Sequence, residues 1–131
     1  MKILAIDPGN IHSAYCLIDS DTYKPLEFGK IENRNLRYGL YNAEYDLLII
    51  EMIASYGMAV GKEVFETCVW IGRFEELALS RTIITKHIYR KDEKMNICHS
   101  MRAKDSNIRQ ALIDRFGTVG TKENPRLVLW I

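Results

Sequence analysis

Two short apolar runs that each end on a carboxylate constrain the fold of this chain most. Residues 2–6, Lys-Ile-Leu-Ala-Ile, lead directly to Asp7, and residues 46–51, Asp-Leu-Leu-Ile-Ile-Glu, end on Glu51. Continuous apolar runs rich in β-branched residues are typical of fully buried central strands. If the two strands are neighbours in an α/β sheet, Asp7 and Glu51 emerge together at one edge of it.

The rest of the chain supplies three more strands and four helices. Turn residues at 8–10 and 19–21 separate the first strands. We expect further strands at 13–18, 26–31 and 82–89, and helices at 34–43, 62–79, 92–98 and from Asp105 or Ser106 to Phe116. The strands carrying Asp7 and Glu51 must be adjacent, so we predict a mixed five-stranded sheet in the order 3-2-1-4-5.

The segment 62–79 is the longest helix candidate, and we predict that it packs across the sheet. Its apolar residues cover more than one stripe, which predicts burial on two sides. Gly72 lies within it, where a missing side chain would permit close packing against another backbone. Excess apolar surface of this kind commonly marks an interface, so we also predict a symmetric homodimer that buries part of this helix, including Trp70.

Composition excludes several classes of protein. A chain of 131 residues suits one domain. No apolar run reaches the length of a membrane span, so we expect no contact with a membrane. Cys16, Cys68 and Cys98 are widely spaced and form no zinc-binding pattern, which indicates reduced cysteines in a cytoplasmic protein.

Charge is distributed unevenly along the chain. Residues 1–80 hold 7 Lys/Arg against 12 Asp/Glu, whereas residues 81–131 hold 11 against 5. An acidic half beside a basic half can indicate a metal site beside a surface that binds a polyanion such as DNA. The candidate phosphate contacts, of which Lys104 is the strongest, are Arg90, Lys91, Lys94, Arg102, Lys104 and Arg109. The alternative is a solvated basic surface without a function.

The carboxylate pair points to a hard metal ion. Two carboxylates at one edge of a sheet repel each other unless a cation neutralises them. Ligands that are oxygen atoms alone favour Mg²⁺ or Mn²⁺. Two such ions about 3.5–4 Å apart can activate a water molecule and stabilise the leaving oxygen in phosphodiester hydrolysis. The alternative is that Asp7 forms a turn with Pro8 and Gly9 and that Glu51 simply reaches solvent.

At these residues the chain resembles the RuvC Holliday junction resolvases. Ile6-Asp7-Pro8-Gly9, with a strand resuming at Ala14-Tyr15, is similar to their opening motif, and residues 48–51 are similar to their second. The glycine-bearing loop and long helix that follow also match. Residues 101–109 resemble phage-type members, in which a lysine-bearing loop leads into a helix. The resemblance covers about residues 1–117. It implies a ribonuclease-H-like fold and a homodimer that cuts four-way DNA junctions with Mg²⁺ held by Asp7 and Glu51.

The end of the chain departs from this family. The resemblance calls for one or two more carboxylates, or a histidine with a carboxylate, at the start of a final helix, and residues 118–131 contain no such pattern. Asp105 looks like a helix cap, and Asp114 lies beside an apolar stripe, so neither is a convincing substitute. We expect one RuvC-like domain over residues 1–131 whose last part, about 118–131, is truncated or altered, as in a prophage remnant. Cleavage should then be very slow or undetectable.

Three functions from different classes remain open at this stage. The first is a metal-dependent, structure-selective DNA endonuclease, and the second is an inactive nuclease-fold module that binds branched DNA or a partner protein. The third is an actin-like or sugar-kinase-like phosphotransferase, which also opens with a strand and an Asp-x-Gly turn. That class needs a second large subdomain, for which 131 residues leave no room.

Overall fold

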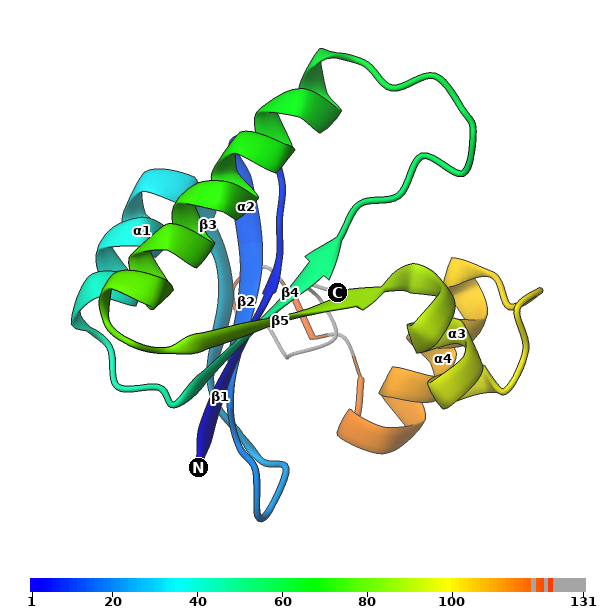
Figure 1. Ribbon diagram of the computed structural model, residues 1–131. Coiled ribbons are helices and arrows are strands. Elements are labelled where there is room, and N and C mark those ends of the chain that lie inside the picture. The colour runs from blue at the N-terminus through cyan, green and yellow to red at the C-terminus, as the bar shows by residue number, and fades with distance from the viewer. Residues whose placement is uncertain (119, 122, 124–131) are drawn as a thin grey trace.

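The computed structural model describes residues 1–118, 120, 121 and 123 (Figure 1). In this part of the chain, five strands form one mixed sheet in the order β3-β2-β1-β4-β5, as the sequence predicts. The strands are β1 (Lys2–Asp7), β2 (His12–Asp19), β3 (Pro25–Glu32), β4 (Leu47–Met52) and β5 (Ile84–Tyr89). The helices are α1 (Asn33–Asn42), α2 (Lys62–Ser80), α3 (Arg90–Cys98) and α4 (Asp105–Phe116).

Strand directions place the two apolar runs at the centre of the sheet. β1 pairs antiparallel with β2 and parallel with β4, and β4 pairs parallel with β5. A parallel pair needs a crossover connection, which is supplied between β1 and β4 by the hairpin strands and α1, and between β4 and β5 by α2. Two parallel strands can therefore end at the same edge of the sheet.

The main core lies between one face of the sheet and the pair formed by α1 and α2 (Figure 1). Side chains alternate between the two faces of a strand, and every second residue of β1 and β4 points into this core. Its buried residues are Leu4, Ile6, Leu36, Leu40, Tyr45, Leu48, Ile50, Ile71, Phe74, Leu77 and Ala78. The helices α3 and α4 form a second pair, set apart from α1 and α2 (Figure 1).

Helix α2 corrects two expectations. One of its faces is buried through Ile71, Phe74 and neighbouring residues. The opposite stripe is open: Phe65 is 61% exposed and Leu79 66% exposed. Gly72 lies on this open stripe, and a Cβ atom added there would meet nothing within 4 Å. Within the described part of this single chain, α2 is therefore buried on one side instead of two, and no other backbone segment packs closely at Gly72.

Element boundaries differ from the expected ones by one or two residues. β5 begins at Ile84 instead of residue 82, because Thr82 adopts a positive φ of 60° in the turn that ends α2. α3 begins at Arg90, two residues earlier than expected, directly after β5. The expectation about residues 118–131 falls mostly on residues outside the described part. Among the described residues, no helix is long and apolar enough to cross a membrane.

Candidate functional site

Strand register brings Asp7 and Glu51 to the same place. Ile6 of β1 is paired with Ile50 of β4, so Asp7 and Glu51 lie one residue further along two parallel strands. Because neighbouring residues of a strand point to opposite faces, both carboxylates leave the core face and point to the face on which α3 and α4 lie. The two side chains are close enough to share a hydrogen bond.

Buried polar side chains fix the turn that follows Asp7. The Ser13 hydroxyl donates to Asn33 Oδ1 at 2.6 Å, and Asn33 Nδ2 donates to the Gly9 carbonyl oxygen at 2.8 Å. The Gly9 amide in turn donates to Ser13 Oγ at 3.1 Å. Ser13 and Asn33 are each only 1% exposed. A closed network of this kind holds the end of β1, and with it Asp7, in one position.

Gly9 is required in this turn for steric reasons. A Cβ atom added at Gly9 would lie 2.2 Å from the His12 carbonyl oxygen, far inside van der Waals contact. The chain reverses here between β1 and β2 without room for a side chain. The glycine of the Ile6-Asp7-Pro8-Gly9 motif is thus explained by close approach of backbone atoms.

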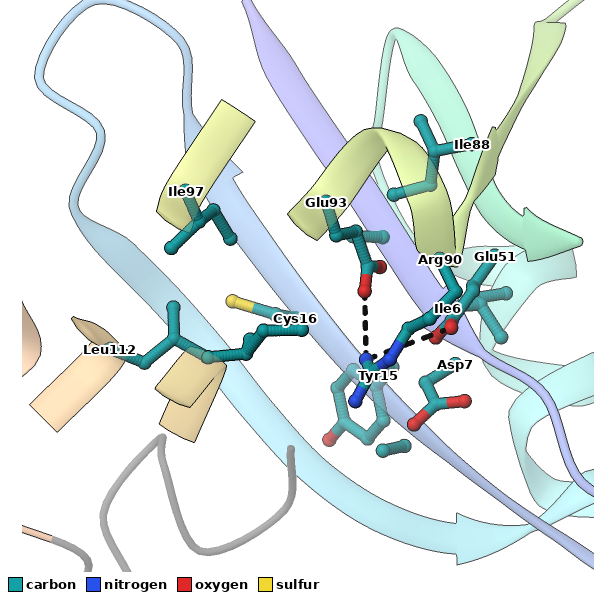
Figure 2. Close-up of a pocket in the computed structure, with 13 residues that line it drawn as sticks. Ile6, Asp7, Tyr15, Cys16, Glu51, Ile88, Arg90, Glu93, Ile97 and Leu112 are labelled. Atoms are coloured by element: carbon teal, nitrogen blue, oxygen red, sulfur yellow. Dashed lines mark hydrogen bonds and ion pairs between the residues drawn. The ribbon is translucent and has the colours of Figure 1, made fainter. Parts of the chain in front are cut away.

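Arg90, the first residue of α3, reaches into the carboxylates. Its guanidinium donates to Glu93 Oε2 at 2.7 Å and to Asp105 Oδ1 at 2.8 Å. The same group lies 3.8 Å from Glu51 Oε1. Figure 2 shows its nitrogen atoms between the Glu93 and Glu51 carboxyl groups, with the Asp7 carboxylate beside them. One cation therefore faces carboxylates from β4, α3 and α4.

The carboxylates are electrostatically coupled in this arrangement. Burial, together with the charges of Asp7 and Glu93, raises the pKa of Glu51 to about 7, while the charge of Arg90 opposes the rise. Burial also raises the pKa of Asp7, against the charges of Arg90 and Lys30. Burial raises the pKa of Glu93 as well, while its bond to Arg90 lowers it. More cationic charge at this position would be favourable.

A pocket of about 260 Å³ opens beside these side chains (Figure 2). It lies on the sheet face opposite the main core, and α3 and α4 form its outer wall. Its lining residues are Ala5, Ile6, Asp7, Ala14, Tyr15, Cys16, Glu51, Ile88, Arg90, Glu93, Ile97, Ile108 and Leu112. Charged groups are confined to one end, where a polar ligand would meet Asp7, Glu51 and Arg90.

The other basic candidates lie on α3, on α4 and on the segment between them. Lys91 and Lys94 belong to α3, Arg102 and Lys104 precede α4, and Arg109 belongs to α4. Each is at least partly exposed. Arg90 differs from them because three carboxylates contact its guanidinium. The basic residues that the sequence singles out thus flank the face that holds the carboxylates.

The residues present suit one divalent cation better than two. Carboxylate oxygens are the ligands that Mg²⁺ and Mn²⁺ prefer, and Arg90 already places a positive charge at this position. Within the described residues, however, no three acidic, histidine or cysteine side chains are arranged to hold a metal ion together. Asp7 and Glu51 therefore provide two ligands, and the Glu93 carboxylate is bonded to Arg90.

Sequence reasoning missed three residues of this site. Glu93 stands three residues after Arg90 on one helix, a spacing that brings oppositely charged side chains together and could have indicated the pair. Ser13 and Asn33 carry no local signal, because their partners lie in other elements. The prediction that Asp105 caps a helix is also corrected. Helix α4 begins at Asp105, and the Asp105 carboxylate binds Arg90 instead of capping the helix. Lys104 is the residue at the cap position.

Strand order, register and the helices on both faces define the ribonuclease-H-like nuclease fold in its RuvC form. The structure is similar to RuvC from Thermus thermophilus, with a TM-score of 0.72 and 13% sequence identity over 99% of this chain and 89% of that chain. It is equally similar to T. thermophilus RuvC in complex with a Holliday junction substrate, with a TM-score of 0.71 and 14% identity over 99% and 88% of the two chains. No family model and no curated protein matches the sequence. At this identity the likeness establishes the fold alone.

Proposed function

We propose that this chain is a metal-dependent, structure-selective DNA endonuclease that acts on branched DNA such as a Holliday junction. The observation that carries the proposal is the matched position of Asp7 and Glu51 on adjacent parallel strands of a RuvC fold. The RuvC structure from T. thermophilus that this fold matches was solved with a Holliday junction substrate. The basic residues on α3, on α4 and on the segment between them lie beside the carboxylates and offer contacts for a DNA backbone.

Each group has a defined part in this proposal. Asp7 and Glu51 would hold Mg²⁺ or Mn²⁺, which when bound supplies a Lewis acid for phosphodiester hydrolysis. The network of Ser13, Asn33 and Gly9 keeps Asp7 in place. The apolar wall of the pocket limits water on one side of the carboxylates. With two carboxylate ligands the ion is held loosely, so cleavage should be slow.

The test is cleavage of an end-labelled four-way junction, with a linear duplex of the same sequence for comparison. We expect slow cleavage of the junction that requires Mn²⁺ or Mg²⁺ and is lost in both Asp7→Asn and Glu51→Gln. The matched control is Glu44→Gln, because Glu44 is an exposed carboxylate just before β4, at the end of that strand opposite Glu51. This variant should cleave like the wild type. Junction binding without any cleavage that depends on Asp7 would contradict the proposal and support an inactive nuclease-fold module.

DNA binding by α3 and α4 can be tested separately. Charge reversal in the double variant Lys104→Glu/Arg109→Glu should weaken junction binding at least tenfold and reduce the slope of log affinity against log salt by about 2. The control is Arg34→Glu/Arg37→Glu, which makes the same charge change on α1, on the other face of the sheet. If both double variants bind alike, the basic residues of α3 and α4 form only a solvated surface.

The open stripe of α2 fits a second copy of this chain. Its exposed residues are Phe65, Cys68, Val69, Gly72 and Leu79, with one charged residue, Glu76, between the last two. Exposed apolar stripes of this length are uncommon on monomers, and the space beside Gly72 lets a second helix backbone approach. In a symmetric dimer the same stripe would face itself. Trp70, which the sequence also assigns to the interface, instead stacks against Phe74 and Arg73 at the border of the core.

Light scattering tests the dimer. The wild type should be a dimer at high micromolar concentration, and Val69→Glu should be a monomer because it would bury an unpaired charge. Tyr38→Glu, a similar change at an exposed residue of α1, should leave the dimer intact. A wild type that stays monomeric at this concentration would contradict the dimer.

A further inference from the structure

Arg90 directs its charge at the carboxylates of the candidate site. Its side chain is 34% exposed, whereas Glu51 and Glu93 are 22% and 17% exposed. The guanidinium contacts Glu51, Glu93 and Asp105, which belong to three different elements. Three carboxylate partners fix the guanidinium in position. A metal ion held by Asp7 and Glu51 would lie close to it.

Strand register explains why Arg90 arrives there. Glu51 of β4 is paired with Ile88 of β5, so Ile88 faces the carboxylate side of the sheet. Arg90 follows two residues later and starts α3, which turns its side chain back over the end of β4 (Figure 2). The contact therefore results from how β5 and α3 join, and three carboxylate partners stabilise it.

We propose that Arg90 is an internal counter-ion that competes with the divalent cation for this site, and that Glu93 is the carboxylate that changes partner when the cation binds. The inference rests on the proposed metal-dependent function. In the arrangement described above, Arg90 neutralises Glu51 and Glu93 and holds Glu93 Oε2 at 2.7 Å. A divalent cation beside Asp7 and Glu51 repels the guanidinium. Arg90 then keeps its bond to the exposed Asp105, and Glu93 becomes the third carboxylate ligand.

This exchange accounts for two observations together. Asp7 and Glu51 alone are few ligands for Mg²⁺, which prefers six oxygen atoms in octahedral geometry. Glu93 lies at the same end of the pocket as both of them, and its charge acts on both Glu51 and Asp7. In this structure its carboxylate is bonded to Arg90 instead. Arg90 therefore lowers the affinity for metal, and its removal should raise that affinity.

The experiment measures Mn²⁺ binding to the full chain by electron paramagnetic resonance of the unbound ion, with no DNA present. We expect Arg90→Gln to bind Mn²⁺ at least tenfold more tightly than the wild type. Arg90→Lys keeps the charge and should stay close to the wild type. The matched control is Lys91→Gln, which removes the charge of the next residue on α3 and should change the affinity by less than about twofold, because exposed charges are well screened.

Two further variants test the part of Glu93. In the double variant Arg90→Gln/Glu93→Gln the gain in affinity should be lost, and Asp7→Asn should abolish binding with or without Arg90. Circular dichroism melting in EDTA checks that each variant folds, and Arg90→Met replaces Arg90→Gln if the latter does not fold. Unchanged or weaker Mn²⁺ binding in the neutral Arg90 variants would overturn the proposal, and so would a gain that persists without Glu93. Because no cleavage is measured, these outcomes are separate from a failure of the endonuclease proposal, which rests on the junction assay.

Discussion

Replacement of Glu51 by glutamine tests whether the carboxylates oppose each other in the metal-free chain. Burial, together with the charges of Asp7 and Glu93, raises the pKa of Glu51 from 4.5 to about 7 in the folded chain. The folded state therefore binds this proton more tightly than the unfolded state does. The stabilisation that this bound proton contributes is complete below the pKa of Glu51 in the unfolded chain. It is lost as the pH rises through about 7. In EDTA, the free energy of unfolding of the wild type should accordingly fall between pH 4.5 and pH 8.

The magnitude follows from the size of this pKa change. A rise from 4.5 to about 7 corresponds to about 3 kcal/mol, since each tenfold change in proton affinity is worth about 1.4 kcal/mol. The Glu51 side chain is 22% exposed, and screening by water reduces the expected cost to about 1–2 kcal/mol. Glutamine has nearly the same shape and no charge. Glu51→Gln should therefore be about 1–2 kcal/mol more stable than the wild type at about pH 9, and nearly equal to it at about pH 4.

Urea unfolding followed by circular dichroism at a series of pH values measures this difference. Glu44→Gln is the control, because it makes the same change at an exposed position before β4 and should follow the wild type at every pH. Added Mn²⁺ should stabilise the wild type at high pH and have little effect on Glu51→Gln, since a ligand stabilises only the state that binds it. Parallel pH curves for the wild type and Glu51→Gln would refute the electrostatic reasoning.

Three further substitutions test the packing around the site, each by its free energy of unfolding. Asn33→Ala leaves the Ser13 hydroxyl and the Gly9 carbonyl without their buried partner and should cost about 2–4 kcal/mol; a loss below about 1 kcal/mol would show that water replaces the amide. Gly9→Ala should cost about 1–3 kcal/mol because its Cβ would lie 2.2 Å from the His12 oxygen, and unchanged Mn²⁺ affinity in this variant would contradict the link between the turn and Asp7. Phe74→Ala empties a site with no exposure and should cost about 3–5 kcal/mol, so a smaller loss would mean that the core collapses around it.

The strand order could be predicted from the sequence because two independent constraints agree. Continuous apolar runs such as residues 47–50 identify central strands, and a carboxylate at the end of each run requires the two strands to be neighbours. The observed register, with Ile6 beside Ile50, is the one that this reasoning needs. Apolar periodicity alone was less reliable on α2, because it does not separate a stripe that packs on the sheet from one that faces outward, such as that of Phe65 and Leu79.

The chemistry that surrounds the carboxylate pair could not be predicted, because it depends on contacts between distant elements. The sequence indicates Arg90 as a phosphate contact by its charge alone, and nothing in the local sequence shows that Glu51 lies 3.8 Å from its guanidinium. Aspartate commonly caps a helix, but Asp105 is the first residue of α4 and its carboxylate forms an ion pair with Arg90. Side chains alternate between the two faces along β5, so the register of β5 with β4 would have indicated the side of the sheet on which Arg90 lies.

The hydrogen bonds among Gly9, Ser13 and Asn33 also determine which parts of the chain must open together. The main-chain amide of Asn33 donates to the Ile11 carbonyl oxygen at 2.8 Å. The first residue of α1 is therefore bonded to the β1–β2 turn by its main chain as well as by its side chain. Local opening of the turn therefore requires the β3–α1 corner to detach at the same time. In hydrogen exchange, the main-chain amide hydrogens of Gly9 and Asn33 should exchange at one common rate. This rate should be slower than that of the exposed loop at residues 54–61. A ligand that binds at Asp7 should slow both amides equally, which makes Asn33 a remote reporter of that site.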